Sequence, residues 1–313
     1  MPLYRIERSS IAEQFGDRAG EADTAVPAHD ETVLSLATAA AKDAIEHAAT
    51  DDFGTVFVAS SSDAGDERGL APHVASAVGA LGDVAVGDFQ GSARAATNAI
   101  LAARDACVAG RGPALVVAAD IMAGAPGTQA EQTAGAGAGA LVLAEDGAVA
   151  GIRETVPNTT GFLGRFKRAG ETPTEGHGRF NRVGYLEAVG DALDGLQAAP
   201  DHVALPDPDG GWGGRALDRT SIEADHHSTF DGVGWAGAAS GLLDLSLALD
   251  RAAPGETVAL AGYGPGGSDV IAFETGDGVA DAPELTVTEY IESKSYVSYA
   301  THRSNRERAR GES

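Results

Sequence analysis

Hydrophobic positions in the first half of the chain alternate between two periods. In residues 31–48 (ETVLSLATAAAKDAIEHA) apolar side chains recur at helical spacing, whereas residues 54–60 (GTVFVAS) form a short β-branched run typical of a buried strand. The succession then repeats, with helices predicted at residues 71–81 and 93–109 and strands predicted at residues 84–89 and 114–119. Strands that alternate with helices in this way indicate a parallel α/β sheet.

Two further strands end the first half of the chain. Residues 136–143 (AGAGALVL) and 149–153 are predicted to be strands, and their closeness in sequence indicates an antiparallel pair. The succession of helices and strands then returns in the second half, where we predict helices at residues 184–196 and 236–252, and strands at residues 202–205, 257–261 and 269–273. We therefore predict two similar α/β halves, residues 1–157 and 183–313, joined by a basic loop at residues 158–182.

Charge restricts the possible partners. The 313 residues include 46 Asp and Glu against 22 Lys and Arg, a formal net charge of −24. This excess repels nucleic acids and anionic membrane surfaces, so neither is expected as a partner. Only Lys42, Lys167 and Lys294 are lysines, and acidic residues run through the whole chain, which favours adaptation to high salt.

Cysteine content and hydropathy indicate a cytoplasmic protein. The single cysteine, Cys107, excludes an internal disulfide, and its place on the apolar side of the helix predicted at residues 93–109 indicates a buried, unreactive thiol. The start MPLYRIERSS lacks the apolar stretch of a signal peptide. No apolar run approaches the roughly 18 residues of a membrane span.

Two short motifs suggest ligand chemistry that their context does not support. Residues 262–267 (GYGPGG) match the dinucleotide pattern, but the following residues continue as a strand, so we predict a hairpin whose glycines allow a close backbone approach. His226 and His227 are adjacent and cannot both point into one site, and we expect them in a solvated loop. Residues 207–210 (DPDG) have the composition of a turn. The sequence therefore predicts no metal site.

Several segments, taken in order, resemble the archaeal 3-hydroxy-3-methylglutaryl-CoA (HMG-CoA) synthases of the thiolase superfamily. They are residues 2–16 (PLYRIERSSIAEQFG), 30–45 (DETVLSLATAAAKDAI), 133–145 (TAGAGAGALVLAE), 177–185 (HGRFNRVGY), 237–269 (GAASGLLDLSLALDRAAPGETVALAGYGPGGSD) and the tail 288–303 (TEYIESKSYVSYATHR). The resemblance implies a thiolase fold, layered αβαβα, and with the acidic composition it implies a halophilic archaeon as source. It also implies a core strand before residue 2, which either another strand replaces or an earlier start would supply.

The residues at the family's catalytic positions depart from the family pattern. In that family a cysteine thiolate accepts an acetyl group, a glutamate is the general acid and base, and a histidine stabilises the second thioester. The resemblance places the cysteine at Ala93, or at Ser92 in a neighbouring register, and the glutamate at Ser61. It places the histidine at Pro206 and an asparagine of the family at Trp235. We therefore expect no catalysis of the family reaction and a narrowed cavity beside the indole.

The resemblance then implies a subunit or scaffold of an acyl-CoA-handling complex. Its implied partners are a second copy in a homodimer, an acetoacetyl-CoA thiolase and a zinc-ribbon/OB-fold protein. No covalently bound cofactor is expected, and CoA or acyl-CoA is the expected ligand. The candidate substrate-binding residues are Arg165, Lys167, Arg168, Ser240, Gly264 and Gly266.

Two alternatives remain open. The first is a divergent acyltransferase with Ser92 as nucleophile and Asp63 or His226 as base, and a hydrogen bond between Ser92 and a base would support it. The second is an interaction module whose cleft is filled. The space beside Trp235 distinguishes this module from a protein that retains an acyl-CoA cleft.

Overall fold

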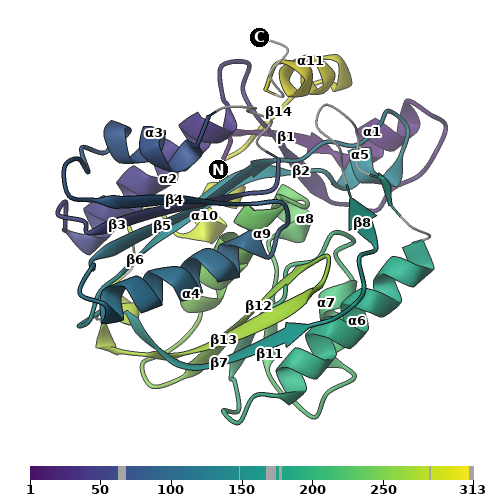
Figure 1. Cartoon of the computed structure of the whole chain (residues 1–313). Helices are drawn as coiled ribbons and strands as arrows, with labels where there is room; N and C mark the ends of the chain where they lie inside the picture. The colour runs from purple at the N-terminus through teal and green to yellow at the C-terminus, as the bar shows by residue number, and fades with distance from the viewer. Residues whose placement is uncertain (63–67, 148, 167–173, 176–177, 282, 310–313) are drawn as a thin grey trace.

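Two β-sheets face each other across a pair of helices (Figure 1). The structure is a computed structural model that describes residues 1–62, 68–147, 149–166, 174–175, 178–281 and 283–309. Among these residues, no helix is long and apolar enough to cross a membrane.

The first sheet belongs to the N-terminal half. Its strand order is β4 (Ala85–Gln90), β3 (Thr55–Ser60), β5 (Ala114–Ile121) and β6 (Ala136–Leu143). β3 is parallel to β4 and to β5, which confirms the parallel arrangement predicted for these strands. β6 runs antiparallel to β5, so the sheet is mixed.

The second sheet is formed by strands of the C-terminal half together with β7 (Ala150–Thr159). Its order is β11 (Asp225–His227), β10 (His202–Ala204), β12 (Thr257–Gly264), β13 (Gly267–Thr275) and β7. β12 and β13 form the hairpin predicted for the glycine-rich motif.

The predicted pairing of β6 with β7 is wrong. β6 pairs with β5 in the first sheet, and β7 pairs with β13 in the second. The connection between β6 and β7 therefore crosses from one sheet to the other, because β13 offers β7 a ladder from Gly267↔Thr159 to Thr275↔Ala150. Closeness in sequence favours a hairpin, but the tertiary ladders with β5 and with β13 prevail.

The N-terminal sheet repeats the order of the other sheet without a counterpart of β7. No strand in the described chain pairs with the outer edge of β6. The first strand, β1 (Tyr4–Glu7), lies instead in a small separate sheet between β14 (Ser295–Tyr296) and β2 (Asp23–Val26). β1 thus does not take the place of the core strand that the resemblance implies.

Helices α4 (Ala95–Val108) and α9 (Ala238–Leu249) fill the space between the two sheets. Both helices contact strands of both sheets and also each other. The helices pack closely, since a Cβ atom at Gly241 of α9 would lie 3.7 Å from the Cβ atom of Ala96, in van der Waals contact. Cys107 of α4 is 6% exposed within this central core, as predicted, and burial raises the pKa of its thiol.

Further helices cover the outer faces and complete the predicted αβαβα layering (Figure 1). α2 (Val33–Ala48) and α3 (Leu70–Ala77) cover the first sheet, whereas α6 (Gly178–Asp194) and α7 (Trp212–Leu217) lie on the second. α6 begins earlier than predicted. α7 was not predicted, because its Gly-rich sequence WGGRAL has no helical hydrophobic pattern.

The remaining elements lie around these layers. They are α1 (Arg8–Glu13), α5 (Gln129–Thr133), β8 (Arg165–Phe166), β9 (Thr174–Glu175), α8 (Phe230–Val233), the 3-10 helix η1 (Asp277–Ala280), α10 (Val287–Glu292) and α11 (Tyr299–Ala309).

Candidate functional site

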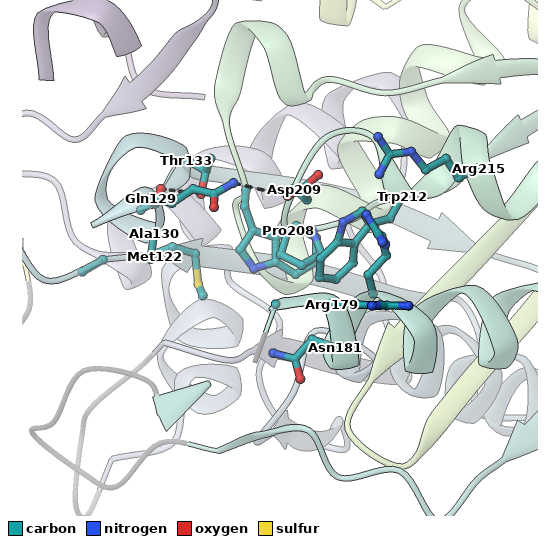
Figure 2. A pocket seen from close by; sticks show the side chains of 15 residues that line it. Met122, Gln129, Ala130, Thr133, Arg179, Asn181, Pro208, Asp209, Trp212 and Arg215 are labelled. Atoms are coloured by element: carbon teal, nitrogen blue, oxygen red, sulfur yellow. Dashed lines mark hydrogen bonds between the residues drawn. The ribbon is translucent and has the colours of Figure 1, made fainter. Parts of the chain in front are cut away.

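A cleft of about 280 Å³ opens between the two halves (Figure 2). Met122 follows β5, and Gln129 and Thr133 on α5 lie on the same side of the cleft. Pro208 and α7 lie on the opposite side. The complete lining is Met122, Ala123, Gln129, Ala130, Thr133, Ala134, Gly178, Arg179, Asn181, Arg182, Pro208, Asp209, Trp212, Arg215 and Trp235.

The lining carries more positive than negative charge. Arg179 and Arg182 come from the first turns of α6, and Arg215 comes from α7. Asp209 is the one acidic residue of the lining, and its Oδ2 accepts a hydrogen bond from Gln129 Nε2 at 3.3 Å. Although the chain has a net charge of −24, the arginines that line this cleft attract anions.

Trp235 forms the floor of the cleft. Its side chain is 7% exposed and packs in a cluster with Met122, Phe230 and Ala134, against which Ala93 also packs. The backbone N–H of Trp235 donates to the carbonyl oxygen of Thr133 at 2.7 Å, which ties the floor to the wall. The structure thus brings together Ala93 and Trp235, two positions where the family's catalytic cysteine and its asparagine are implied.

Ser61, the position implied for the glutamate, belongs to a buried network around Asp120. Asp120 is fully buried at the end of β5. Its carboxylate accepts hydrogen bonds of 2.6–2.8 Å from the hydroxyls of Ser60, Ser61 and Ser62 and from the backbone N–H groups of Ser61, Ser62 and Ala238. Ser61 Oγ also lies 3.7 Å from Met122 Sδ. The Ser61 hydroxyl therefore lies behind the cleft floor and donates its proton to Asp120.

Asp120 also fixes the N-terminus of α9. Ala238 N donates to Asp120 Oδ2 at 2.6 Å, and Gly237 before it has φ +56°. A Cβ atom at Gly237 would collide with the Asp120 carboxylate and with Ser61 Oγ, so this position requires glycine. Asp120 was not identified from the sequence, because its only signal there is a carboxylate at the end of an apolar strand.

The start of α4 is held by an ion pair that joins the halves. Arg94 donates from Nε and from Nη2 to the two carboxylate oxygens of Asp269, both at 2.6 Å. Asp269 is 3% exposed and also accepts from Thr97 Oγ1 at 3.2 Å. The hydrogen bonds to Asp269 raise the pKa of Arg94.

Ser92 has no catalytic base beside it in the described residues. No histidine or carboxylate in this part of the chain hydrogen-bonds to its hydroxyl. Ser92 lies instead against Gly264, where a Cβ atom would approach Ser92 Oγ to 2.6 Å. Asp63, one of the two candidate bases, lies outside the described residues.

His226 and His227 lie on β11, so the prediction of a solvated loop is wrong. Both are half-buried, because β11 pairs with β10 at the edge of the second sheet. Burial lowers the pKa of both imidazoles. His227 Nε2 is 2.9 Å from His202 Nδ1, and His226 packs beside Gly213 of α7. In the described residues, no group of three or more His, Cys, Asp or Glu side chains is placed to hold a metal ion.

Pro206, the position implied for the histidine, is buried two residues after the end of β10. Its carbonyl oxygen accepts from Tyr185 Oη at 3.2 Å. Asp207 follows it, 3% exposed, and accepts from the backbone N–H of Asp209 at 2.8 Å and of Gly213 at 2.9 Å. These bonds confirm the predicted turn and hold the start of α7. Burial raises the pKa of Asp207, although the backbone N–H groups oppose that shift.

The predicted substrate-binding residues divide into three groups. Ser240, Gly264 and Gly266 do not line the cleft. Ser240 Oγ accepts from Ala236 N at 2.9 Å, and the glycines bring the β12–β13 hairpin against Ser92 and Arg94. Arg165 lies on β8, opposite Glu175 of β9. Lys167 and Arg168 lie outside the described residues.

The C-terminal helix α11 supports the cleft wall. This role was not predicted from the sequence. Arg306, 5% exposed, donates to the carbonyl oxygens of Met122 and Ala134 and, at 2.8 Å, to that of Ala25. Glu131 on α5 accepts from Tyr299 Oη at 3.0 Å. The partners of Arg306 come from distant segments, so no local pattern revealed this role.

The chain is similar in sequence to hydroxymethylglutaryl-CoA synthases. The hydroxymethylglutaryl-CoA synthase of Methanopyrus kandleri is 29% identical over 326 residues, which cover 96% of this chain and 93% of that protein. The corresponding synthase of Methanocella arvoryzae is 29% identical over 325 residues, covering 96% and 94%. No protein-family model matches the chain.

Solved structures of such synthases share the fold. PksG, an HMG-CoA synthase from Bacillus subtilis, superposes with a TM-score of 0.84 at 16% identity, covering 96% of this chain and 84% of that chain. MvaS in complex with HMG-CoA gives a TM-score of 0.77 at 18% identity, covering 97% and 88%. An HMG-CoA synthase complexed with CoA gives 0.75 at 17% identity, covering 96% and 86%. The chain therefore has the thiolase-like fold of these structures and is HMG-CoA synthase-like over nearly its whole length.

Proposed function

We propose that this HMG-CoA synthase-like protein does not catalyse the family reaction and serves as a subunit or scaffold of an acyl-CoA-handling complex. One observation carries the proposal: Ala93 packs against the cluster that contains Trp235 and Met122, and the Ser61 hydroxyl lies 3.7 Å from Met122 Sδ. At Ala93, Ser61 and Trp235 the resemblance implies a cysteine, a glutamate and an asparagine. A methyl group cannot accept an acyl group, and the Ser61 hydroxyl donates to Asp120. The proposed setting is the cytoplasm of a halophilic archaeon.

A divergent acyltransferase that uses Ser92 is the second candidate function. An alcohol becomes a good nucleophile when an adjacent base removes its proton. Among the described residues Ser92 has no such base, and His226 packs against α7 instead. The non-catalytic function is therefore the better supported of the two.

Intact-mass spectrometry after incubation with acetyl-CoA tests the proposal. The expected spectrum contains no acetylated species, because neither position at the start of α4 supplies an activated nucleophile. Ser92→Ala is the matched control. A stable acetyl adduct on the unsubstituted protein that disappears in Ser92→Ala would overturn the proposal and support the acyltransferase.

We further propose a homodimer that pairs along β4. This strand is an edge of the first sheet in the described chain, and Val86 on it is 44% exposed. An exposed strand edge is a template for pairing with a second copy. Light scattering in molar salt is expected to give twice the 31.6 kDa of one chain, and Val86→Pro is expected to give a monomer.

The remaining proposed partners are an acetoacetyl-CoA thiolase and a zinc-ribbon/OB-fold protein. Co-purification from native high-salt extract, followed by identification of the proteins that accompany the chain, tests both. Recovery of the chain with neither protein would contradict this assignment.

CoA or acyl-CoA is the proposed ligand of the complex. Solved relatives hold CoA or HMG-CoA, and Arg165, Lys167 and Arg168 are the proposed phosphate contacts. Calorimetry is expected to detect weak CoA binding that Arg165→Ala combined with Arg168→Ala weakens further. Binding that is indifferent to both substitutions would remove these residues from the ligand site.

A further inference from the structure

Two arginines of the cleft lining have no ion pair with an acidic side chain of the described residues. Arg182 on α6 is half-buried and Arg215 on α7 is exposed, and both line the cleft. No carboxylate within the described residues forms an ion pair with either guanidinium. Acidic residues outnumber basic ones 46 to 22 in this chain, so two unneutralised arginines in one cleft indicate a binding role for an anion.

The rest of the lining includes a rigid apolar surface. Trp212 is 8% exposed, Trp235 7% and Met122 8%, so each presents only a small part of its side chain to the cleft. An indole that is already fixed by packing loses little conformational freedom when a ligand contacts it. This surface therefore suits an apolar or planar group better than a hydrated one.

The volume of the cleft limits the size of its occupant. Trp235 belongs to the apolar cluster against which Ala93 packs, and Ala93 itself does not line the cleft. The volume of about 280 Å³ lies just below the range of ligand pockets, roughly 300–1,000 Å³. A ligand in this space is therefore a compact molecule rather than the tip of a long chain that extends to Ala93.

We infer that the cleft binds a small organic oxyanion, a carboxylate or phosphate monoester attached to a compact apolar body. Arg182 and Arg215 bind the charged group, since the planar guanidinium matches either oxyanion through paired N–H donors. The apolar body contacts Trp212 and Trp235. This inference goes beyond the proposed function, because it holds whether or not the protein transfers acyl groups.

Tryptophan fluorescence reports directly on this cleft. The chain has two tryptophans, and both line the cleft. Phenylacetate and phenyl phosphate are the probes, and neutral phenylacetamide and the small anion acetate are the controls, all titrated at one fixed molar ionic strength. The two probes are expected to give saturable changes. Phenylacetamide, which lacks the charge, and acetate, which lacks the apolar body, are expected to bind at least tenfold more weakly.

Arginine variants distinguish binding at Arg182 and Arg215 from general electrostatic attraction of the anion to the protein. Arg182→Gln and Arg215→Gln are each expected to weaken phenylacetate binding about tenfold. Arg111→Gln is the matched control, because Arg111 is exposed near the opposite end of β5 from Met122 and its loss changes the net charge equally. The control is expected to bind like the unsubstituted protein. Far-ultraviolet circular dichroism verifies that each variant is folded.

Three results would overturn the inference. They are equal binding of phenylacetate and phenylacetamide, equal binding by the cleft variants and Arg111→Gln, and CoA binding that depends on both cleft arginines while neither small probe binds. The last result would instead identify the two cleft arginines as contacts for the phosphate groups of CoA. Acetylation of the protein would contradict the proposed function alone, so the two conclusions fail on separate measurements.

Discussion

Arg94 and Asp269 join the two halves of the molecule through a two-pronged ion pair. Arg94 stands at the start of α4 in the first half, and Asp269 lies on β13 in the second. The hairpin can come this close because Gly267 has no side chain, since a Cβ atom there would lie 2.7 Å from Arg94 Nη1. The glycine-rich motif thus serves contact between the halves rather than a dinucleotide.

Asp269→Asn is expected to destabilise the fold by about 3–5 kcal/mol, because it leaves the guanidinium of Arg94 largely buried without its carboxylate. Urea unfolding at fixed molar salt measures the loss. In the double variant Arg94→Met with Asp269→Leu, no uncompensated charge remains, and recovery of at least half of the loss is expected. A single variant within 1 kcal/mol of the unsubstituted protein would contradict a structural role for the pair.

The sequence predicted the layered fold well where the hydrophobic pattern was long. α2, β3, α4 and β5 were predicted within a few residues because each has a clear period. The partner of β7 was not predictable in this way, since the choice between two sheets depends on tertiary pairing. α7 was missed because a contact with the Asp207 carboxylate, and not a hydrophobic pattern, holds its start.

The candidate site was only partly accessible from the sequence. The resemblance supplied Ala93 and Trp235, and the structure places both at one apolar cluster. The cleft arginines and Arg306 were not found, because their roles depend on α6, α7 and α11 converging on the segment after β5. The basic composition of residues 158–182 pointed toward this region, but the predicted contacts were Arg165, Lys167 and Arg168 rather than Arg182 and Arg215.

Thermal stability is expected to rise with salt. With a net charge of −24, mutual repulsion opposes the compact state, and the screening length falls from about 10 Å at 0.1 M to about 3 Å at 1 M salt. Differential scanning fluorimetry across this range is expected to give a melting temperature that increases throughout. A melting temperature that is unchanged between the two salt concentrations would show that charge repulsion does not limit stability.

Acidification below pH 6.5 is expected to destabilise the protein through His302. This residue is fully buried, and burial together with the charges of Arg306 and Arg303 lowers its pKa from 6.5 to about 2. Between pH 6.5 and about pH 2 the imidazole binds a proton in the unfolded chain but not in the folded chain. The contribution of neutral His302 to the free energy of unfolding is therefore complete above pH 6.5 and is lost as the pH falls.

The matched variant for this effect is His302→Asn, which retains an acceptor for Arg306 Nε but does not titrate. Between pH 7 and pH 5 the free energy of unfolding of the unsubstituted protein is expected to fall by about 2 kcal/mol more than that of the variant. Urea unfolding at both pH values measures the difference. Parallel losses in the two proteins would contradict the assignment to His302.

Asp244 is expected to act in the opposite direction. This carboxyl on α9 is 1% exposed, and burial raises its pKa from 3.8 to about 7, although the hydroxyl and backbone N–H of Thr229 donate to it. Between these values the folded chain holds a proton that the unfolded chain has released. Its contribution to stability is therefore complete below about pH 4 and is lost as pH rises through 7.

Asp244→Asn retains an oxygen acceptor for Thr229 and removes the titrating carboxyl group. The stability of the variant relative to the unsubstituted protein should therefore increase as the pH rises. Between pH 5 and pH 8 the difference in unfolding free energy is expected to shift by about 2–3 kcal/mol in favour of the variant. Thr229 leads into α8 and then to Trp235, so tryptophan fluorescence should follow the same titration near pH 7 in the unsubstituted protein only. A stability difference that does not vary with pH would exclude Asp244 as the titrating group, because nothing else distinguishes the two chains.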